Sequence, residues 1–214
     1  MTPGPNKILK IPTSGVMVKI STIGSGNTCR ARFWTDGKME APMLPDNPWL
    51  RRHPTSGQLF WTDECEEIGE EEPWKPKDTA FADVPFAEEP TLEDYRIALA
   101  TGVAASIEQE KYIRIRFWWT ANDPVRRNEI NEAKDEDFYD NLFKLSALLD
   151  IANPHERFMA LEARREMQDF EMVHRCLREF EFPANYAETV ILIKRLADEE
   201  DFTVREICTT PKRA

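Results

Sequence analysis

Histidine and cysteine, the side chains best suited to metal binding and nucleophilic chemistry, are few and widely spaced in this chain. The four cysteines form no Cys-x-x-Cys pair, which favours free thiols in a reducing compartment. His53 with Cys29 and Cys65 could supply three zinc ligands, but structural zinc needs four groups that converge as a tetrahedron. We therefore predict no bound metal and no cofactor, and we interpret His53 as an ordinary turn residue.

Arrangements that activate a nucleophile or hold a phosphate do not stand out either. His174 and Cys176 lie on one predicted helix, where side chains this close in sequence point in different directions. Gly24-Ser25-Gly26 lacks the helix and the lysine that follow in a phosphate-binding loop, so it is most simply a hairpin turn. We predict a non-catalytic protein. The alternative is an enzyme whose site is assembled from separated residues.

Basic and aromatic residues alternate in the N-terminal part, a composition that could clamp and stack a single-stranded nucleic acid. The whole chain carries a net charge of −11, however, and repels phosphate. Nucleic-acid binding therefore stays an alternative, and its candidate residues are Arg30, Arg32, Trp34, Arg51 and Arg52.

Acidic residues gather just after this basic part. Residues 1–63 have eight Lys and Arg against four Asp and Glu, whereas residues 64–94 have twelve acids against two lysines. Such a segment can be a solvated linker, can pair within the molecule, or can attract a basic partner. We predict that a partner protein binds the acidic strip, defined as Glu64, Glu66, Glu67, Glu70, Glu71 and Glu72, and a basic surface on that partner would match it.

The predicted secondary structure changes along the chain, from short strands before residue 91 to helices after it. Eleven of the fifteen prolines precede residue 91, which excludes long helices there. Residues 16–20, 29–34 and 58–61 have strand composition. Phe-Trp-Thr-Asp occurs at 33–36 and again at 60–63; this indicates either a duplicated unit or, as we prefer, two strand ends with similar turn chemistry. Residues 64–90 are predicted to form no regular element.

From Thr91 onward the pattern is that of successive amphipathic helices. Helix starts are predicted at Thr91-Leu92-Glu93-Asp94, Ser106, Asp135 and Asn153-Pro154, and the second helix is expected to end before Asn122-Asp123-Pro124. The segment 115–119 is apolar around much of its circumference, so we expect it to be nearly buried. Further helices are predicted from Phe170, from Pro183 and, capped by Asp201 or Thr203, at the end.

Two segments resemble known families. Residues 51–61 resemble a zinc-ribbon knuckle, with His53 and Ser56 where that family has ligands; a serine is a poor ligand, so the resemblance implies a knuckle-shaped turn without metal. Residues 160–170, followed by Leu177 and Pro183, resemble the middle of a tetratricopeptide repeat. The pattern departs at Gln168, where that family usually has Gly, and lacks a small residue at 174 or 175.

The tetratricopeptide resemblance extends over about residues 137–207, and it implies stacked helical hairpins that bind peptides or partner proteins. The alternative is a plain helical bundle. We predict an α+β protein with a small β-rich domain at 1–70, an acidic connector at 71–90 and a helical domain at 91–214. Without a secretory signal or a long apolar run, we expect it in the cytoplasm, bound to another protein and not to a membrane.

Overall fold

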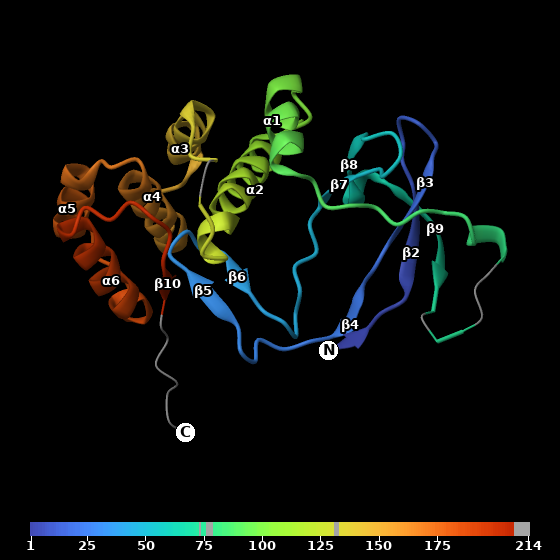
Figure 1. Ribbon diagram of the computed structural model, residues 1–214, viewed down its shortest axis with the longest axis horizontal. Helices are drawn as coiled ribbons and strands as arrows, with labels where there is room; N and C mark the ends of the chain where they lie inside the picture. The colour runs from blue at the N-terminus through green and yellow to red at the C-terminus, as the bar shows by residue number, and fades with distance from the viewer. Residues whose placement is uncertain (73, 76–78, 131–132, 208–214) are drawn as a thin grey trace. The chain divides into compact units, whose positions relative to one another are not determined.

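The computed structural model describes residues 1–72, 74–75, 79–130 and 133–207 (Figure 1). The chain divides into two compact units, each described here by itself. The first unit contains Met1–Ala31 and Glu40–Ala98, and the second contains Arg32–Met39 and Leu99–Ala214. Most strands precede residue 72 and six α-helices follow residue 91, so the predicted α+β class is confirmed.

Short antiparallel strands build the first unit. One sheet has the order β3-β2-β9, and its core of Leu9, Ile11, Val18, Ile20 and Phe60 is buried. The remaining strands pair as β1 with β4 and β7 with β8. The bounds are β1 (Thr2–Pro3), β2 (Asn6–Lys10), β3 (Met17–Ile20), β4 (Ile23–Ser25), β7 (Leu50–Arg52), β8 (Leu59–Trp61) and β9 (Glu66–Glu71), with 3-10 turns η1 (Thr62–Glu64) and η2 (Thr79–Phe81).

Strand β9 corrects one prediction, since residues 64–90 were expected to form no regular element. Glutamate-rich sequences rarely form strands by themselves, but β9 pairs antiparallel with β2, which carries lysines. Lys7 lies 2.6 Å from Glu67, and Lys19 of β3 lies 2.8 Å from Glu71. These opposite charges stabilise the strand. Residues 73 and 76–78 of the predicted connector lie outside the described residues.

Helices and one small sheet build the second unit, in which each helix from α2 to α6 packs against the next along the chain. The sheet has the order β10-β5-β6. Its strands are β5 (Arg32–Trp34), β6 (Met39–Glu40) and β10 (Glu206–Ile207). The helices are α1 (Leu92–Thr101), which spans the boundary of the units, α2 (Ile107–Arg126), α3 (Glu136–Leu148), α4 (Pro154–Glu166), α5 (Phe170–Glu179) and α6 (Ala187–Asp198), preceded by the 3-10 turn η3 (Ala184–Tyr186).

The predicted helix starts are confirmed by their capping bonds. Ser106 accepts a hydrogen bond from the N–H of Gln109, and Asp135 accepts one from the N–H of Phe138. Asn153 caps α4 in the same way, with Pro154 in the first turn. Trp118 in the apolar part of α2 is fully buried, as the pattern around it predicted. Side-chain oxygens at these positions satisfy N–H groups that the helix itself leaves unpaired.

Two helix predictions are wrong, one about where a helix ends and one about whether a helix forms. Helix α2 continues through Pro124 to Arg126, because a proline this near the C-terminus removes only one helical N–H while Asn122 and Arg126 gain buried contacts with Asp36. The short last helix, predicted to be capped by Asp201 or Thr203, does not form: residues 201–205 are non-helical and lead to β10. Arg165 donates hydrogen bonds to the carbonyl oxygens of Asp201 and Thr203, which keeps these carbonyls from accepting helical hydrogen bonds. No described helix combines the length and apolarity that crossing a membrane requires.

Candidate functional site

The hairpin of α4 and α5 is shaped by its turn. Gln168 has a φ of +64°, in the left-handed region where glycine is favoured, and its N–H donates to the carbonyl of Arg165 at 2.9 Å. Asp169 then caps α5 by accepting from the N–H of Met172. The chain therefore reverses within two residues, and this brings one face of α4 beside one face of α5.

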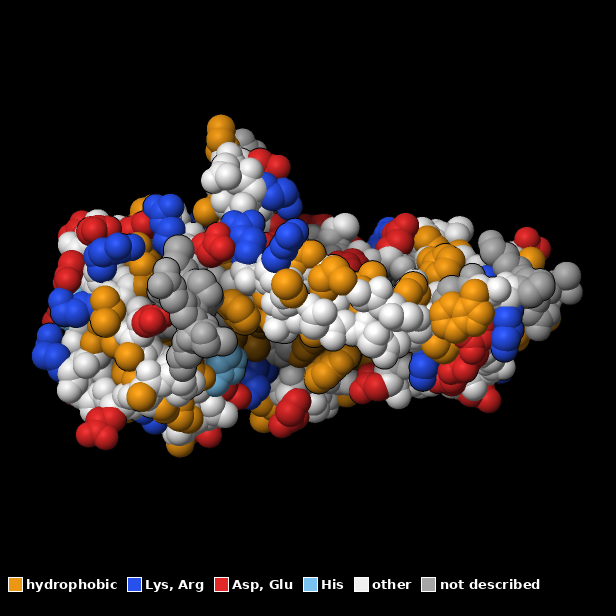
Figure 2. Space-filling model, turned by 90° about the horizontal axis from the view of Figure 1, so that it is seen from below, with side chains coloured by type: hydrophobic (Ala, Val, Ile, Leu, Met, Phe, Trp, Pro, Cys, Tyr) orange, Lys and Arg blue, Asp and Glu red, His pale blue; other side chains and the backbone are white. Residues whose placement is uncertain are grey.

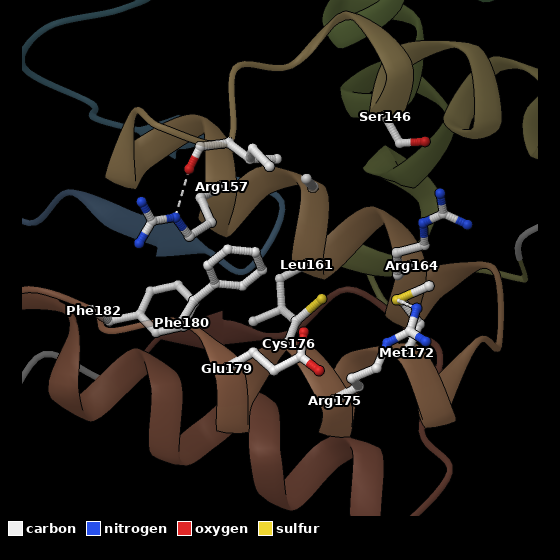
Figure 3. Close-up of a pocket in the computed structure, with 12 residues that line it drawn as sticks. Ser146, Arg157, Leu161, Arg164, Met172, Arg175, Cys176, Glu179, Phe180 and Phe182 are labelled. Carbon is white, nitrogen blue, oxygen red and sulfur yellow. Dashed lines mark hydrogen bonds between the residues drawn. The ribbon is translucent and has the colours of Figure 1, made fainter.

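A surface groove of about 380 Å³ lies along this hairpin (Figure 3). Both helices contribute residues at i, i+3, i+4 and i+7, which fall on one side of a helix. Ser146 of α3 and the loop residues around the hairpin complete it. Throughout, the groove means the residues Ser146, Ile151, Arg157, Ala160, Leu161, Arg164, Met172, Arg175, Cys176, Glu179, Phe180 and Phe182.

Arg157 holds one end of the groove in place. Its Nε donates to the carbonyl of Ile151 at 2.6 Å, and its Nη1 donates to the carbonyl of Glu181 at 2.7 Å. Its guanidinium also lies 5.1 Å from the ring of Phe180 and 5.9 Å from that of Phe182. All these partners are neutral, so the positive charge of Arg157 is ordered without being cancelled.

At the other end lie Arg164 and Arg175, across Leu161 and Cys176 from the two phenyl rings (Figure 3). Among the residues that the structure describes, the ion pair of Arg164 is a long contact of 3.4 Å with Asp169. Arg175 is exposed and donates to the sulfur of Met172, and no ion pair of Arg175 is seen in the part of the chain that the structure describes. Three arginines and one acid, Glu179, thus give the groove a positive charge.

The floor of the groove is continuous with the helical core. Leu161 and Cys176 pack with Phe158, Val173 and Ile193 of that core. Burial raises the pKa of the Cys176 thiol, so this thiol stays protonated near neutral pH. His174 faces away toward α6, where its Nε2 lies 3.7 Å from Asp198. The two residues therefore occupy different sides of α5.

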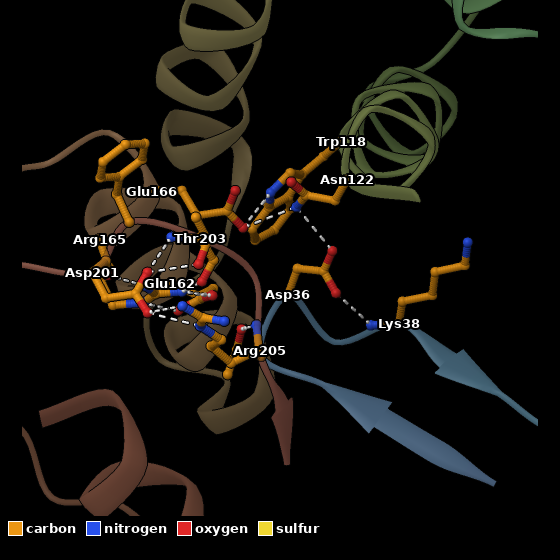
Figure 4. Close-up of polar contacts among 12 residues, drawn as sticks. Asp36, Lys38, Trp118, Asn122, Glu162, Arg165, Glu166, Asp201, Thr203 and Arg205 are labelled. Atoms are coloured by element: carbon orange, nitrogen blue, oxygen red, sulfur yellow. Dashed lines mark hydrogen bonds and ion pairs between the residues drawn. The ribbon is translucent and has the colours of Figure 1, made fainter. Parts of the chain in front are cut away.

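The opposite side of α4 holds buried charges (Figure 4). Glu162 and Arg165 are fully buried, and the Nε of Arg165 donates to Glu162 at 2.8 Å. Arg165 also donates to the carbonyls of Asp201 and Thr203, the latter at 2.8 Å. A buried pair with all its polar groups engaged costs far less than a buried single charge. This pair therefore fixes the segment after α6 against α4.

Glu166 continues this cluster toward α2. One carboxylate oxygen accepts from the indole N–H of Trp118 and from the amide of Asn122, both at 3.0 Å, and the other lies 2.9 Å from the ammonium of Lys134. Burial, with smaller contributions from Glu162 and Asp36, raises the pKa of Glu166 to about 7 in spite of Lys134. Because its two oxygens bind groups on α2 and before α3, Glu166 joins the helices.

Asp36 is the third buried acid, and it lies on the β5–β6 hairpin. It forms an ion pair with Arg126 and accepts from the amide of Asn122 at 3.1 Å, while its carbonyl accepts from the indole of Trp119 at 3.0 Å. Burial raises the pKa of Asp36, and Arg126 opposes that shift. The hairpin from the N-terminal part of the sequence is thereby held on α2.

The acidic strip lies on and around β9. Glu67 and Glu71 form ion pairs with lysines of the same sheet, and Glu71 is buried. Glu64, Glu66 and Glu70 are exposed, and Glu72 is half-buried. Figure 2 shows acidic side chains between basic ones on the visible face of this unit. The strip therefore presents less unpaired negative charge than six glutamates in nine residues suggest.

The residues of the nucleic-acid alternative have partners of their own. Arg32 pairs with Glu206 and stacks on Trp34 at 4.6 Å, and the Trp34 side chain is buried. Arg51 is buried and donates to Asn47 at 2.6 Å, and Arg52 pairs with Glu88. These contacts engage several of the groups that would meet a phosphate, although the Arg32 side chain stays exposed.

Arg30 lies in a turn, and His53 begins one. Arg30 is exposed with a φ of +61°. The Nδ1 of the buried His53 accepts from the N–H groups of Thr55 and Ser56, at 3.3 and 3.1 Å, so this turn is tied by an imidazole. Burial and neighbouring acids raise the pKa of Cys65 to about 11. Among the described residues no three His, Cys, Asp or Glu side chains converge on one point; Cys208 lies outside them.

Comparisons with family models, with curated proteins and with solved structures found no match for this chain. The tetratricopeptide and zinc-ribbon resemblances therefore stay predictions, and the site has to be interpreted from its own chemistry.

Sequence reasoning missed the groove, although a signal was present. Arg157, Ala160, Leu161 and Arg164 repeat the spacing of Met172, Arg175, Cys176 and Glu179 on the next helix. Each set combines small or apolar residues with long charged ones on one helix face, and a short turn between two such faces brings them together.

Proposed function

We propose that this chain is a non-catalytic interaction protein, and that its helical unit holds a segment of a partner protein in the groove. The observation that supports this most is an apolar floor beside arginines whose charge no strong ion pair cancels. Arginine next to packed aromatic rings is the kind of residue on which binding energy concentrates at protein interfaces. A structural ion pair would by contrast resemble the closed Glu162–Arg165 contact on the other side of the same helix.

Two further features agree with a binding surface. Ile151 at the rim of the groove is 53% exposed, and an apolar side chain in that position gains free energy when a partner covers it. The left-handed Gln168 stands where the tetratricopeptide family usually has glycine, so we include stacked hairpins of that kind in the proposal. We also expect the protein to act in the cytoplasm.

Comparative capture from the native host tests the proposal. The groove variant carries Ile151→Ser and Arg175→Gln, two exposed positions whose replacement leaves the core intact. The matched control carries Ile191→Ser and Arg178→Gln, which are also exposed, on α6 and α5, but lie outside the groove. We expect quantitative mass spectrometry to find a protein that wild type and control retain and the groove variant loses.

A second readout on the wild-type chain uses its own thiols. Partner binding should slow alkylation of Cys176 in the groove and leave that of the exposed Cys29 unchanged. A partner retained equally by all three proteins, with Cys176 alkylated at the free rate, would place the binding surface elsewhere.

A further inference from the structure

We infer that the partner segment held by the groove is acidic and apolar at once: one or two bulky hydrophobic side chains flanked by Asp or Glu. This inference rests on the proposed function and adds the chemistry of the partner. It departs from the expectation of a basic partner, which rested on the acidic strip.

The charges of the groove select for carboxylates. Arg157 and Arg175 make no ion pair among the described residues, and Arg164 has only the long contact with Asp169. Glu179 is the one acid among the lining residues. Guanidinium groups bind carboxylates through paired, charge-assisted hydrogen bonds. A carboxylate that approaches from solvent would meet two such groups still available at the same end of the groove, those of Arg164 and Arg175.

The floor selects for apolar side chains. Leu161 and Cys176 lie between the arginines, and Phe180 and Phe182 flank the side of Arg157 (Figure 3). A volume of about 380 Å³ accommodates a pair of Phe or Leu side chains. Because apolar and charged groups alternate over a few ångströms, an extended or helical peptide with both kinds of residue matches better than either kind alone.

Two other anionic ligands fit less well. A single-stranded nucleic acid carries a phosphate at every nucleotide, and the apolar floor between the two ends of the groove offers those phosphates no partner. A fatty acid offers one carboxylate to three arginines that lie at opposite ends. The peptide supplies several separated carboxylates, and we therefore commit to it.

Fluorescence anisotropy with defined probes tests the inference. The first probe is a short labelled peptide in which Phe and Leu alternate with Asp and Glu, and the second has Lys in place of every acid. A single-stranded oligonucleotide and dodecanoate serve as unlabelled competitors. We expect the acidic probe to bind, the basic probe to bind at least about tenfold more weakly, and neither competitor to displace the acidic probe.

Three single variants should change the affinity for the acidic probe in three different ways. Arg175→Gln should weaken binding of the acidic probe about three- to fivefold, Glu179→Gln should tighten it about twofold, and Arg178→Gln on the same helix should leave it unchanged. Thermal melting checks that each variant is folded.

The inference is overturned if the acidic probe does not bind, if the basic probe binds as well, if Glu179→Gln weakens binding, or if either competitor displaces the peptide. The proposed function can survive each of these results, since a captured partner that depends on the groove variant and docks through a basic segment would support it. Loss of groove dependence in the capture experiment would instead overturn the function, whatever the probes do.

Discussion

The two units of this protein both bury paired charges, but they differ in which charges are left without a strong ionic partner. The first unit keeps its acidic strip on strand β9, where Lys7 and Lys19 of the same sheet neutralise part of it. The second unit buries acids and bases together in its core, yet leaves arginines in the groove without strong ion pairs. Charge density in sequence is therefore a poor guide to where a partner binds, because what counts is the charge left after intramolecular pairing.

The two Phe-Trp-Thr-Asp copies show the same contrast at one residue. Asp36 in the second unit is fully buried against Arg126, whereas Asp63 in the first unit is exposed in the turn η1. The tetrapeptide makes a strand end followed by a turn in both places. The burial and the ionic partner of its aspartate depend on the residues that surround each copy.

The largest expected effect is loss of a buried charge under the groove. Arg165→Met leaves Glu162 buried without its partner, so we expect the free energy of unfolding to fall by about 3–5 kcal/mol. Urea denaturation measures it. Lys7→Met, which breaks the exposed pair with Glu67, is the matched control in the first unit and should cost no more than about 1 kcal/mol. Equal losses would show that burial does not decide how much an ion pair contributes to the stability of this protein.

The repeated tetrapeptide gives the next largest difference. Asp36→Ala leaves Arg126 buried with only Asp123 as an ionic partner, and we expect a loss of about 2–4 kcal/mol in unfolding free energy. Asp63→Ala removes an exposed acid and should change stability by no more than about 0.5 kcal/mol. Similar melting temperatures for the two variants would show that Asp36 is not a structural charge.

A pH series tests Glu166. Its pKa of about 7 in the folded protein lies above the ordinary 4.5, so the folded state binds this proton more tightly than the unfolded chain does. Its contribution to stability is therefore complete at low pH and decreases as the pH rises from about 4.5 to about 7. Between pH 5 and pH 8, the free energy of unfolding of Glu166→Gln should rise relative to that of wild type by on the order of 1–3 kcal/mol. A difference independent of pH would contradict the raised pKa.

The smallest effects concern the acidic strip. Replacing Glu66, Glu67 and Glu70 by Gln should shift the melting temperature very little, because these side chains are exposed. If the groove is the binding surface, the affinity for the acidic probe should also stay within about twofold. Slower association with the natural partner, and a flatter dependence on salt, would instead show that the strip attracts a basic partner.

Local signals made the helical fold predictable. Asp135, Asn153 and Asp169 each cap the helix that follows, and such side-chain bonds need only a few neighbouring residues. Strand β9 was missed because its stability depends on β2, some sixty residues away in sequence. The end of α2 was predicted too early, before Pro124, for a similar reason. Arg126 in the same helical turn pairs with Asp36, which is 90 residues away in sequence.

The candidate site depends on such distant partners even more. The sequence shows which residues are arginines, but not that Arg157 bonds carbonyls while Arg165 pairs with an acid three residues away. On α4 these residues are eight positions apart, which is only about 80° around the helix axis, so the helical period alone does not assign one to the groove and the other to the core. Which face is buried follows from the packing of α2, α3 and α5, which no single segment specifies.

Photo-cross-linking compares the two surfaces most directly. A photo-reactive phenylalanine analogue replaces Phe182 in the groove of one variant and Glu70 in the strip of another, and both are irradiated with extract of the native host. We predict that position 182 captures a partner through a peptide that contains apolar side chains and more acids than bases, and that position 70 does not. Capture of a partner from position 70 alone would contradict the account.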